Sequence, residues 1–488
     1  MTQMLQRLGG LLLGTGLLLL GAFPAGADDD FRLPEIGDPS GGVMTRVQEQ
    51  RLGQAFMRNV RKQLNVITDP WMSDYIQSLG GRLASNSSAQ GQRFHFFLID
   101  SPVVNAFAGP DGHIGVFAGL LLTTETESEL ASVIAHEIAH VTQKHLVRAF
   151  DDASRLSLPM GALALAAAVI GGQSQLGAAA MAGVQAGMVQ HQINFTRANE
   201  HEADRMGIHT LARADFNPRA MPVFFERMGR ATRFYGTELP EFLRTHPVTT
   251  NRIADSRGRA ETYPYRQHPD SLGYHLVRAT LRERQYEDPK DAVRFFRETL
   301  ADGRYRNEAG QRYGYALALL RNRDYKGARA ELDKLLQDQP QQTAYRILDA
   351  RLYRESGKPE RALATLEAAL KLSPDSYPLT MAYAQTLLDT GNPRPARQAL
   401  EKLLPRRPLD AALYELLSQA AGDAGEINQA HEYLAEHYFL SGRLEQARQQ
   451  LEIALRDKNI SLFRGERMSA RLKQIQGEIA ELKRQRNR

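Results

Sequence analysis

The sequence predicts an α+β fold that is mostly helical, in which a first domain with a small β-sheet or hairpin precedes an all-α solenoid. Apolar residues recur at helical spacing through most of the chain. A strand followed by a hairpin pattern occurs near residue 100, and a repeating helical unit fills the second half. A chain of 488 residues is too long for one hydrophobic core, so two or three domains are expected.

The N-terminal residues have the pattern of an export signal. Arg7 supplies a short positive region, residues 9–23 form an apolar run, and small residues ending at Ala27 form a cleavage site. The run is too short for a good membrane span, although an uncleaved anchor is the alternative. We therefore expect residues 1–27 to be a cleaved signal peptide and residues 28–42 to be the N-terminal arm of a mature periplasmic chain without a transmembrane segment.

Charge and cysteine content restrict the possible partners and stabilising elements. The formal net charge of +5 is small for this length, and no basic stripe accompanies it, so nucleic acid is not an expected partner. The sequence contains no cysteine, which excludes disulfides. Stability must then come from packing and from metal binding.

The first domain begins with helical patterns and continues with strand patterns. Helices are expected between residues 43 and 85, and residues 94–99 read as a buried strand. Residues 105–108 and 114–117 flank Pro110-Asp111-Gly112, whose aspartate and glycine accept the backbone angles of a tight turn. These segments predict the small sheet.

A capping box predicts the helix that follows. Thr126 and Glu129 can satisfy the first free amides of a helix from about Glu127 to about Val147. A second helix is expected from about residue 179 to residue 214. The glycine-interrupted stretch between the two helices is a candidate loop or lid, and a membrane-embedded protein would require residues 156–188 to span lipid.

The first of these helices carries a pair of histidines with metal-ligand spacing. His136 and His140 lie four residues apart, so both imidazoles face one side of a helix and can share one zinc ion. Glu137 projects close to the same face without ligating. Because zinc lowers the pKa of water toward about 7, this carboxylate could accept a proton there. The spacing therefore indicates a catalytic zinc site.

A second acidic cluster supplies candidates for the third ligand. Glu200 is the preferred ligand, and Asp204 lies on the same helical face, where it can bind the free nitrogen of a ligand histidine. Asn199 could do the same for the other histidine. Glu202 is the competing ligand, but it points about 160° away from Glu200 on a helix. We expect that Glu202→Gln leaves zinc affinity unchanged.

His145 is an alternative third ligand that the spacing disfavours. It follows His140 by five residues without an intervening glycine, whereas the metzincin pattern requires six residues with a glycine. We expect His145 to be an ordinary exposed histidine.

The second half of the chain has the period of tetratricopeptide repeats. Ala328, Ala362 and Ala396 are separated by equal steps of about 34 residues, and proline and leucine positions keep the same step. Such units stack into a concave superhelix that binds proteins. Residues 270–460 should form this solenoid, and residues 461–488 a basic amphipathic helix that caps the stack.

The first domain resembles the gluzincin metallopeptidases, specifically the family that contains HtpX and the CAAX prenyl protease. In that family the third ligand lies in a Glu-x-x-Ala-Asp pattern, which residues 200–204 match. Residues 105–114 and residues 245–247, together with Arg252, are also similar to the family. The resemblance covers residues 43–265, which we take as a zinc metallopeptidase domain of zincin type.

The resemblance has implications for activity and partners. It implies a zinc endopeptidase with one Zn²⁺ per chain, acting on stalled or misassembled outer-membrane β-barrel proteins and serving as a chaperone. It also implies that the solenoid contacts the β-barrel assembly machinery and the lipopolysaccharide transport complex. A rival hypothesis is a non-catalytic chaperone or adaptor with a structural zinc site.

Three further expectations concern the site. His246 could hydrogen-bond the oxyanion or occupy the fourth zinc position and keep the enzyme off, the alternative being a surface histidine before a proline. Arg252 should pair with a carboxylate near the site. An extended substrate should add a strand beside the Phe107 or Val116 edge of the sheet.

Overall fold

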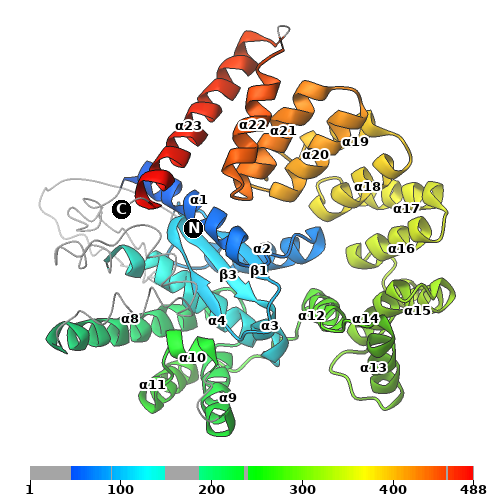
Figure 1. The fold of residues 1–488 in the computed structure, drawn as a ribbon. Helices are drawn as coiled ribbons and strands as arrows, with labels where there is room; N and C mark the ends of the chain where they lie inside the picture. Colours follow the sequence, from blue (N-terminus) through cyan, green and yellow to red (C-terminus); the bar gives the residue numbers. More distant parts are fainter. Residues whose placement is uncertain (1–44, 90, 149–185, 236–239, 458–459, 487–488) are drawn as a thin grey trace, which may run out of the picture.

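The computed structural model describes residues 45–89, 91–148, 186–235, 240–457 and 460–486 (Figure 1). The predicted signal peptide and N-terminal arm, and most of the candidate lid, lie outside these ranges. The described part is a mostly helical α+β fold with one small sheet followed by stacked helices, which confirms the predicted fold class.

The sheet has three strands in the order β1-β3-β2. Strand β1 (His95–Ile99) runs parallel to β3 (His113–Phe117), and β2 (Ala106–Ala108) runs antiparallel to β3. Asp111 and Gly112 have φ angles of 55° and 70° in the turn between β2 and β3. The predicted hairpin is therefore present, and its aspartate and glycine provide the left-handed backbone that the turn needs.

Two capped helices pack near the sheet. Helix α1 (Arg46–Gln63) begins at a capping box made by Thr45 and Gln48. Helix α2 (Pro70–Ser85) begins where the Asp69 side chain accepts from the amide of Met72. Their buried apolar faces cover β1 and the turn after β2, which fixes the sheet against the first domain's core.

Helix α4 (Glu127–Thr142) is the central helix of the first domain, and its first thirteen residues are buried. The Thr126 hydroxyl accepts from the amide of Glu129, while the Glu129 carboxylate accepts from the amide of Glu125 rather than from that of Thr126. The start of the helix is as predicted. Its end comes five residues before Val147, because Lys144 has a φ of 54° and turns the chain.

Helix α8 (Ala186–Arg213) packs along α4 (Figure 1). A Cβ built on Gly207 would lie 3.3 Å from the backbone nitrogen of His136, so the missing side chain lets the two helices approach closely. Helix α11 (Thr250–Glu261) contacts α8, and α9 (Ala220–Tyr235) contacts α4 and α11. The short α10 (Glu241–Thr245) precedes His246. This arrangement aligns the two sequence clusters that contain the candidate ligands.

The second half of the chain is a curved stack of paired helices. Ala328, Ala362 and Ala396 are at most 2% exposed, because these small residues lie where paired helices meet. The short α3 (Ala118–Thr123) belongs to the first domain and follows β3. The stack begins with α12 (Leu272–Arg284) and continues with α13 (Pro289–Ala301), α14 (Glu308–Arg321), α15 (Tyr325–Asp338), α16 (Thr343–Glu355), α17 (Pro359–Leu372), α18 (Tyr377–Asp389), α19 (Pro393–Glu401), α20 (Ala411–Asp423), α21 (Ile427–Leu440) and α22 (Leu444–Ala454).

The stack forms an arc that returns to the first domain (Figure 1). Helix α12 contacts α2 and α3, while α21 contacts α1. The guanidinium of Arg61 donates to the carbonyl of Leu440 at 2.8 Å, and Arg58 pairs with Glu478. The final helix, α23 (Leu462–Arg486), buries Met468 and other apolar residues against α22, as expected for a cap.

Candidate metal centre

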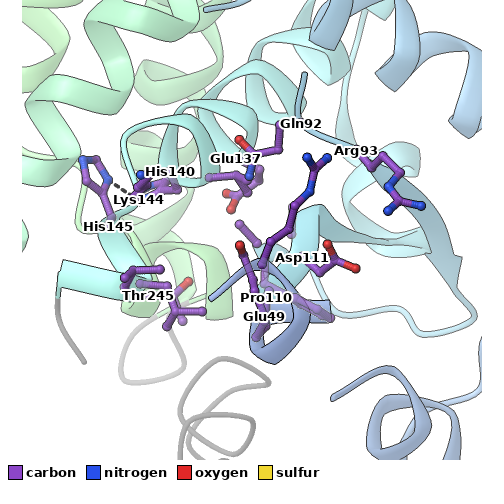
Figure 2. A pocket seen from close by; sticks show the side chains of 18 of the residues that line it. Glu49, Gln92, Arg93, Pro110, Asp111, Glu137, His140, Lys144, His145 and Thr245 are labelled. Carbon is purple, nitrogen blue, oxygen red and sulfur yellow. Dashed lines mark hydrogen bonds between the residues drawn. The ribbon is translucent and has the colours of Figure 1, made fainter. Parts of the chain in front are cut away.

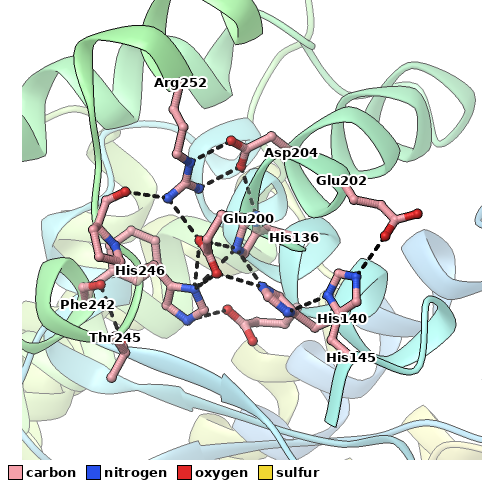
Figure 3. Close-up of polar contacts among 12 residues, drawn as sticks. His136, His140, His145, Glu200, Glu202, Asp204, Phe242, Thr245, His246 and Arg252 are labelled. Atoms are coloured by element: carbon pink, nitrogen blue, oxygen red, sulfur yellow. Dashed lines mark hydrogen bonds and ion pairs between the residues drawn. The ribbon is translucent and has the colours of Figure 1, made fainter. Parts of the chain in front are cut away.

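Two histidines and a glutamate from different helices converge in the first domain (Figure 3). The Nε2 atoms of His136 and His140 are 3.0 Å apart. Oxygens of Glu200 lie 3.4 Å from His136 Nε2 and 3.3 Å from His140 Nε2. The structure thus brings the three predicted ligands together from α4 and α8.

His246 completes a group of four possible donors. Ligand atoms of His136, His140, Glu200 and His246 all lie within 4.8 Å of one another. His246 is 8% exposed, its Nδ1 is 3.2 Å from the carboxylate of Glu200, and its ring packs on Phe242. The alternative of a surface histidine is therefore wrong.

The electrostatics of the group favour a bound cation. Burial opposes protonation of His136, but Glu200 and Asp204 together raise the pKa of His136 to about 10. Burial also raises the pKa of Glu200, yet His246 and His136 hold that pKa well below its usual range. Anionic carboxylates therefore face imidazole nitrogens in a buried space. Two imidazoles and one carboxylate are also the donor set of known catalytic zinc sites, so these residues fit a divalent metal.

Glu137 lies beside the donors and has an unsatisfied oxygen. The residue is 1% exposed, and its Oε1 has no hydrogen-bond partner among the described residues. That oxygen lies 3.4 Å from His246 Nε2. A buried carboxylate oxygen without a donor is costly, which indicates that a further polar group belongs next to Glu137 during function.

Asp204 and Arg252 support the first ligand histidine. His136 Nδ1 is 3.0 Å from Asp204, and the Arg252 guanidinium donates to both oxygens of Asp204 at 2.7 and 2.8 Å. Arg252 also reaches Glu200 at 2.9 Å and the carbonyl of Pro247 at 2.8 Å. The structure places Asp204 and Arg252 where the sequence analysis expects them, and the arginine also anchors the turn after His246.

The second ligand histidine, His140, is supported by His145 and not by Asn199, the candidate from the sequence. His145 Nδ1 is 2.9 Å from His140 Nδ1, and His145 Nε2 is 3.1 Å from Glu202 (Figure 3). The prediction of an exposed His145 is wrong, because this residue is 5% exposed. Burial and the neighbouring His140 lower the pKa of His145 to about 4. Asn199 is half-buried and makes no hydrogen bond to either ligand histidine in the described structure.

A cavity of about 580 Å³ opens in front of the donors (Figure 2). Glu137, His140 and His246 line it together with strand β2. Strand β3 has a neighbour on each side, so the predicted substrate edge at Val116 is wrong. Phe107 lies on β2, which is an outer strand of the described sheet and borders the cavity.

The fold and the site together define a metallopeptidase, because a buried donor set and a general-base candidate meet in a cleft beside an open sheet edge. Comparison with known families agrees. Residues 70–260 match the model of peptidase family M48, and residues 353–420 match a tetratricopeptide repeat model. The chain belongs to peptidase family M48 and is a metallopeptidase with tetratricopeptide repeats.

Two curated relatives match most of the chain, and a third matches less than half of it. The β-barrel assembly-enhancing protease of Escherichia coli (strain K12) is 34% identical over 458 residues, which are 93% of each chain. A putative β-barrel assembly-enhancing protease of Vibrio cholerae is 36% identical and covers 82% of each chain. The mitochondrial metalloendopeptidase OMA1 of Arabidopsis thaliana is 28% identical over 43% of this chain and 42% of its own.

No helix in the described ranges is long and apolar enough to cross a membrane.

Proposed function

We propose that this chain is a periplasmic zinc endopeptidase that acts on outer-membrane β-barrel proteins during their assembly. The observation that carries the peptidase part is the convergence of His136, His140 and Glu200 beside the unsatisfied oxygen of Glu137. The assembly role is supported by the similarity, over 93% of the chain, to a protease whose name states that it enhances β-barrel assembly.

His136, His140 and Glu200 would hold one Zn²⁺ per chain. A zinc ion in this position supplies Lewis acidity, which lowers the pKa of water and polarises a carbonyl group. Glu137 accepts the proton of the attacking water and then delivers it to the leaving amine. Asp204 fixes the tautomer of His136 by accepting from its Nδ1–H.

His246 would have one role in a closed state of the site and another in a state that holds substrate. Its Nδ1 lies within the donor group, which supports a closed state in which His246 takes the fourth ligand position. Its Nε2 faces Glu137, which supports hydrogen bonding to the oxyanion once a substrate has displaced the ring from the donors. A higher kcat for His246→Ala supports the closed state, whereas a lower kcat supports the oxyanion role.

An extended substrate segment would bind along β2. In the antiparallel pairing of β2 with β3, alternate residues of β2 point their amide and carbonyl away from β3. Ala108 is one of these residues, so its amide and carbonyl face the outer edge of β2, which borders the cavity. Main-chain hydrogen bonds to such an edge give affinity with little dependence on sequence. Proteins that fail to complete a β-barrel expose extended segments of this kind.

The remaining parts of the proposal concern location and partners. Residues 1–27 would direct the chain to the periplasm and be removed, and residues 28–42 would become its N-terminal arm. The curved solenoid, at residues 270–460, would hold unfolded clients as a chaperone and contact the β-barrel assembly machinery and the lipopolysaccharide transport complex.

The proposal is tested with Glu137→Gln. The variant should fold and bind zinc like the wild type but cleave an unfolded outer-membrane protein at least about 100-fold more slowly, because it lacks the proton acceptor. Glu226→Gln is the control, since Glu226 lies on α9 and forms an ion pair with Arg257 at the surface. Undiminished cleavage by the Glu137 variant, or by chelated wild type, would refute a zinc-dependent reaction through Glu137. Absence of cleavage by zinc-loaded wild type would leave only the non-catalytic adaptor.

A further inference from the structure

We infer that His145 and Glu202 form a relay that positions His140 for metal binding, so that each ligand histidine is held by its own carboxylate from α8. This inference rests on the proposed zinc site. His136 is held directly by Asp204, at 3.0 Å. His140 is held through one additional imidazole.

The proton positions along the relay follow from one another. His140 Nε2 faces His136 Nε2 and Glu200, so it must offer its lone pair to the metal. The other nitrogen, His140 Nδ1, then carries the proton and donates to His145 Nδ1 at 2.9 Å. His145 in turn carries its proton on Nε2 and donates to Glu202 at 3.1 Å.

The backbone shape at the end of α4 makes the relay possible. On a continuous helix, a residue five positions after His140 would lie about 140° around the axis from it. The turn at Lys144, with its φ of 54°, instead brings the His145 ring to a centroid distance of 4.9 Å from the His140 ring. A specific backbone turn and a buried imidazole therefore serve this one contact.

The relay acts on the ligand that packing restrains less. The side chain of His140 is 15% exposed and borders the cavity, whereas that of His136 is 1% exposed. Glu202 is itself positioned by Arg148 at 3.4 Å and Arg205 at 3.8 Å. Without the relay, the His140 ring would lose the hydrogen bond that fixes its tautomer and its orientation.

Four variants of the full-length chain test the inference: His145→Leu, His145→Gln, Glu202→Gln and the His145→Leu/Glu202→Gln double variant. Zinc affinity is measured by competition with a chromophoric chelator, and ligand geometry by the absorption spectrum of the cobalt-loaded chain. Loss of a hydrogen-bond partner behind a ligand histidine typically weakens metal binding about 10–100-fold. We expect such a loss, with an altered cobalt spectrum, for His145→Leu and Glu202→Gln. For Glu202→Gln this replaces the expectation from sequence alone that zinc affinity is unchanged, because Glu202 contacts His145.

Glutamine at position 145 separates positioning from packing. Its side chain can accept from His140 and donate to Glu202, so His145→Gln should recover much of the affinity that His145→Leu loses. The double variant should bind zinc no more weakly than His145→Leu, because both changes break the same chain of bonds. His209→Leu is the control, since His209 is an exposed histidine on α8.

The outcomes separate this inference from the proposed function. Wild-type zinc affinity and an unchanged cobalt spectrum in His145→Leu and Glu202→Gln would overturn the relay, even if the melting temperature fell. Additive losses in the double variant would also overturn it. A chain that binds zinc but cleaves no protein would refute the proposed function, while the affinities would still decide the relay.

Discussion

Replacement of Arg252 by methionine should destabilise the first domain strongly. Arg252 is 2% exposed and neutralises two buried carboxylates, through two bonds to Asp204 and one to Glu200. It also donates to the carbonyl of Pro247. Methionine has a similar length but no charge, so both carboxylates would keep their burial and lose their main cationic partner.

The size of the effect follows from these contacts. Removing one partner of a buried ion pair costs about 3–5 kcal/mol, because the remaining charge is left uncompensated. For a domain of this size, that corresponds to a fall of about 6–20 °C in melting temperature. The loss should be smaller in zinc-loaded protein, since a bound cation compensates part of the carboxylate charge.

Thermal unfolding of the full chain, with chelator and with zinc, measures both effects. Arg257→Met is the matched control on the same helix, because Arg257 pairs with Glu226 at the surface and is 57% exposed. A surface pair contributes about 0–1 kcal/mol, so the control should melt within about 4 °C of the wild type. Equal melting temperatures for the two variants would refute the reasoning, as would a larger loss for Arg252→Met in zinc than in chelator.

Two further predictions concern the rest of the first domain. Burial and the neighbouring His95 lower the pKa of His113 from 6.5 to about 3. The contribution of the neutral imidazole to stability is therefore complete above pH 6.5 and is lost as the pH falls toward 3. Over that range the free energy of unfolding should fall by up to about 1.4 kcal/mol per pH unit. Urea midpoints at pH 7 and pH 4 should therefore differ less in His113→Gln than in wild type, and an equal difference would contradict this. A Cβ on Gly119 would lie 2.0 Å from the carbonyl oxygen of Pro102, so Gly119→Ala should lower the free energy of unfolding by about 1–3 kcal/mol. Gly81→Ala, whose Cβ meets nothing within 4 Å inside α2, should instead raise it by up to about 1 kcal/mol, and equal unfolding midpoints for the two alanine variants would be inconsistent with this packing.

The sequence predicted features that depend on local spacing. The strand near residue 95, the turn at Asp111 and the start of α4 at Thr126 each follow from a few adjacent residues, and each is present in the structure. The pairing of His136 with His140 likewise needs only the pitch of one helix. Glu200 is predictable because it lies in an acidic cluster about 60 residues downstream in which Asp204 shares its helical face.

Features that depend on a single backbone turn were not predictable. The position of His145 depends on the left-handed backbone of Lys144, and lysine carries no sequence signal for that conformation. Periodicity therefore extended α4 to Val147 and placed His145 at the surface. The position of Asn199 relative to the ligand histidines was not predictable either. It depends on the rotation of α8 relative to α4, which only tertiary packing determines.

The return of the repeat arc to its starting domain has a mechanical consequence. A free stack of helical repeats can change its curvature and length, because each unit contacts only its neighbours. Here the stack contacts the first domain through α12 at its beginning, through α18 and the Arg407–Asp74 ion pair in its middle, and through Arg61 on α1 near its end. A force applied anywhere along the arc is therefore passed to the metallopeptidase domain through a nearby contact, and the arc is held at a fixed curvature that a free stack would not keep.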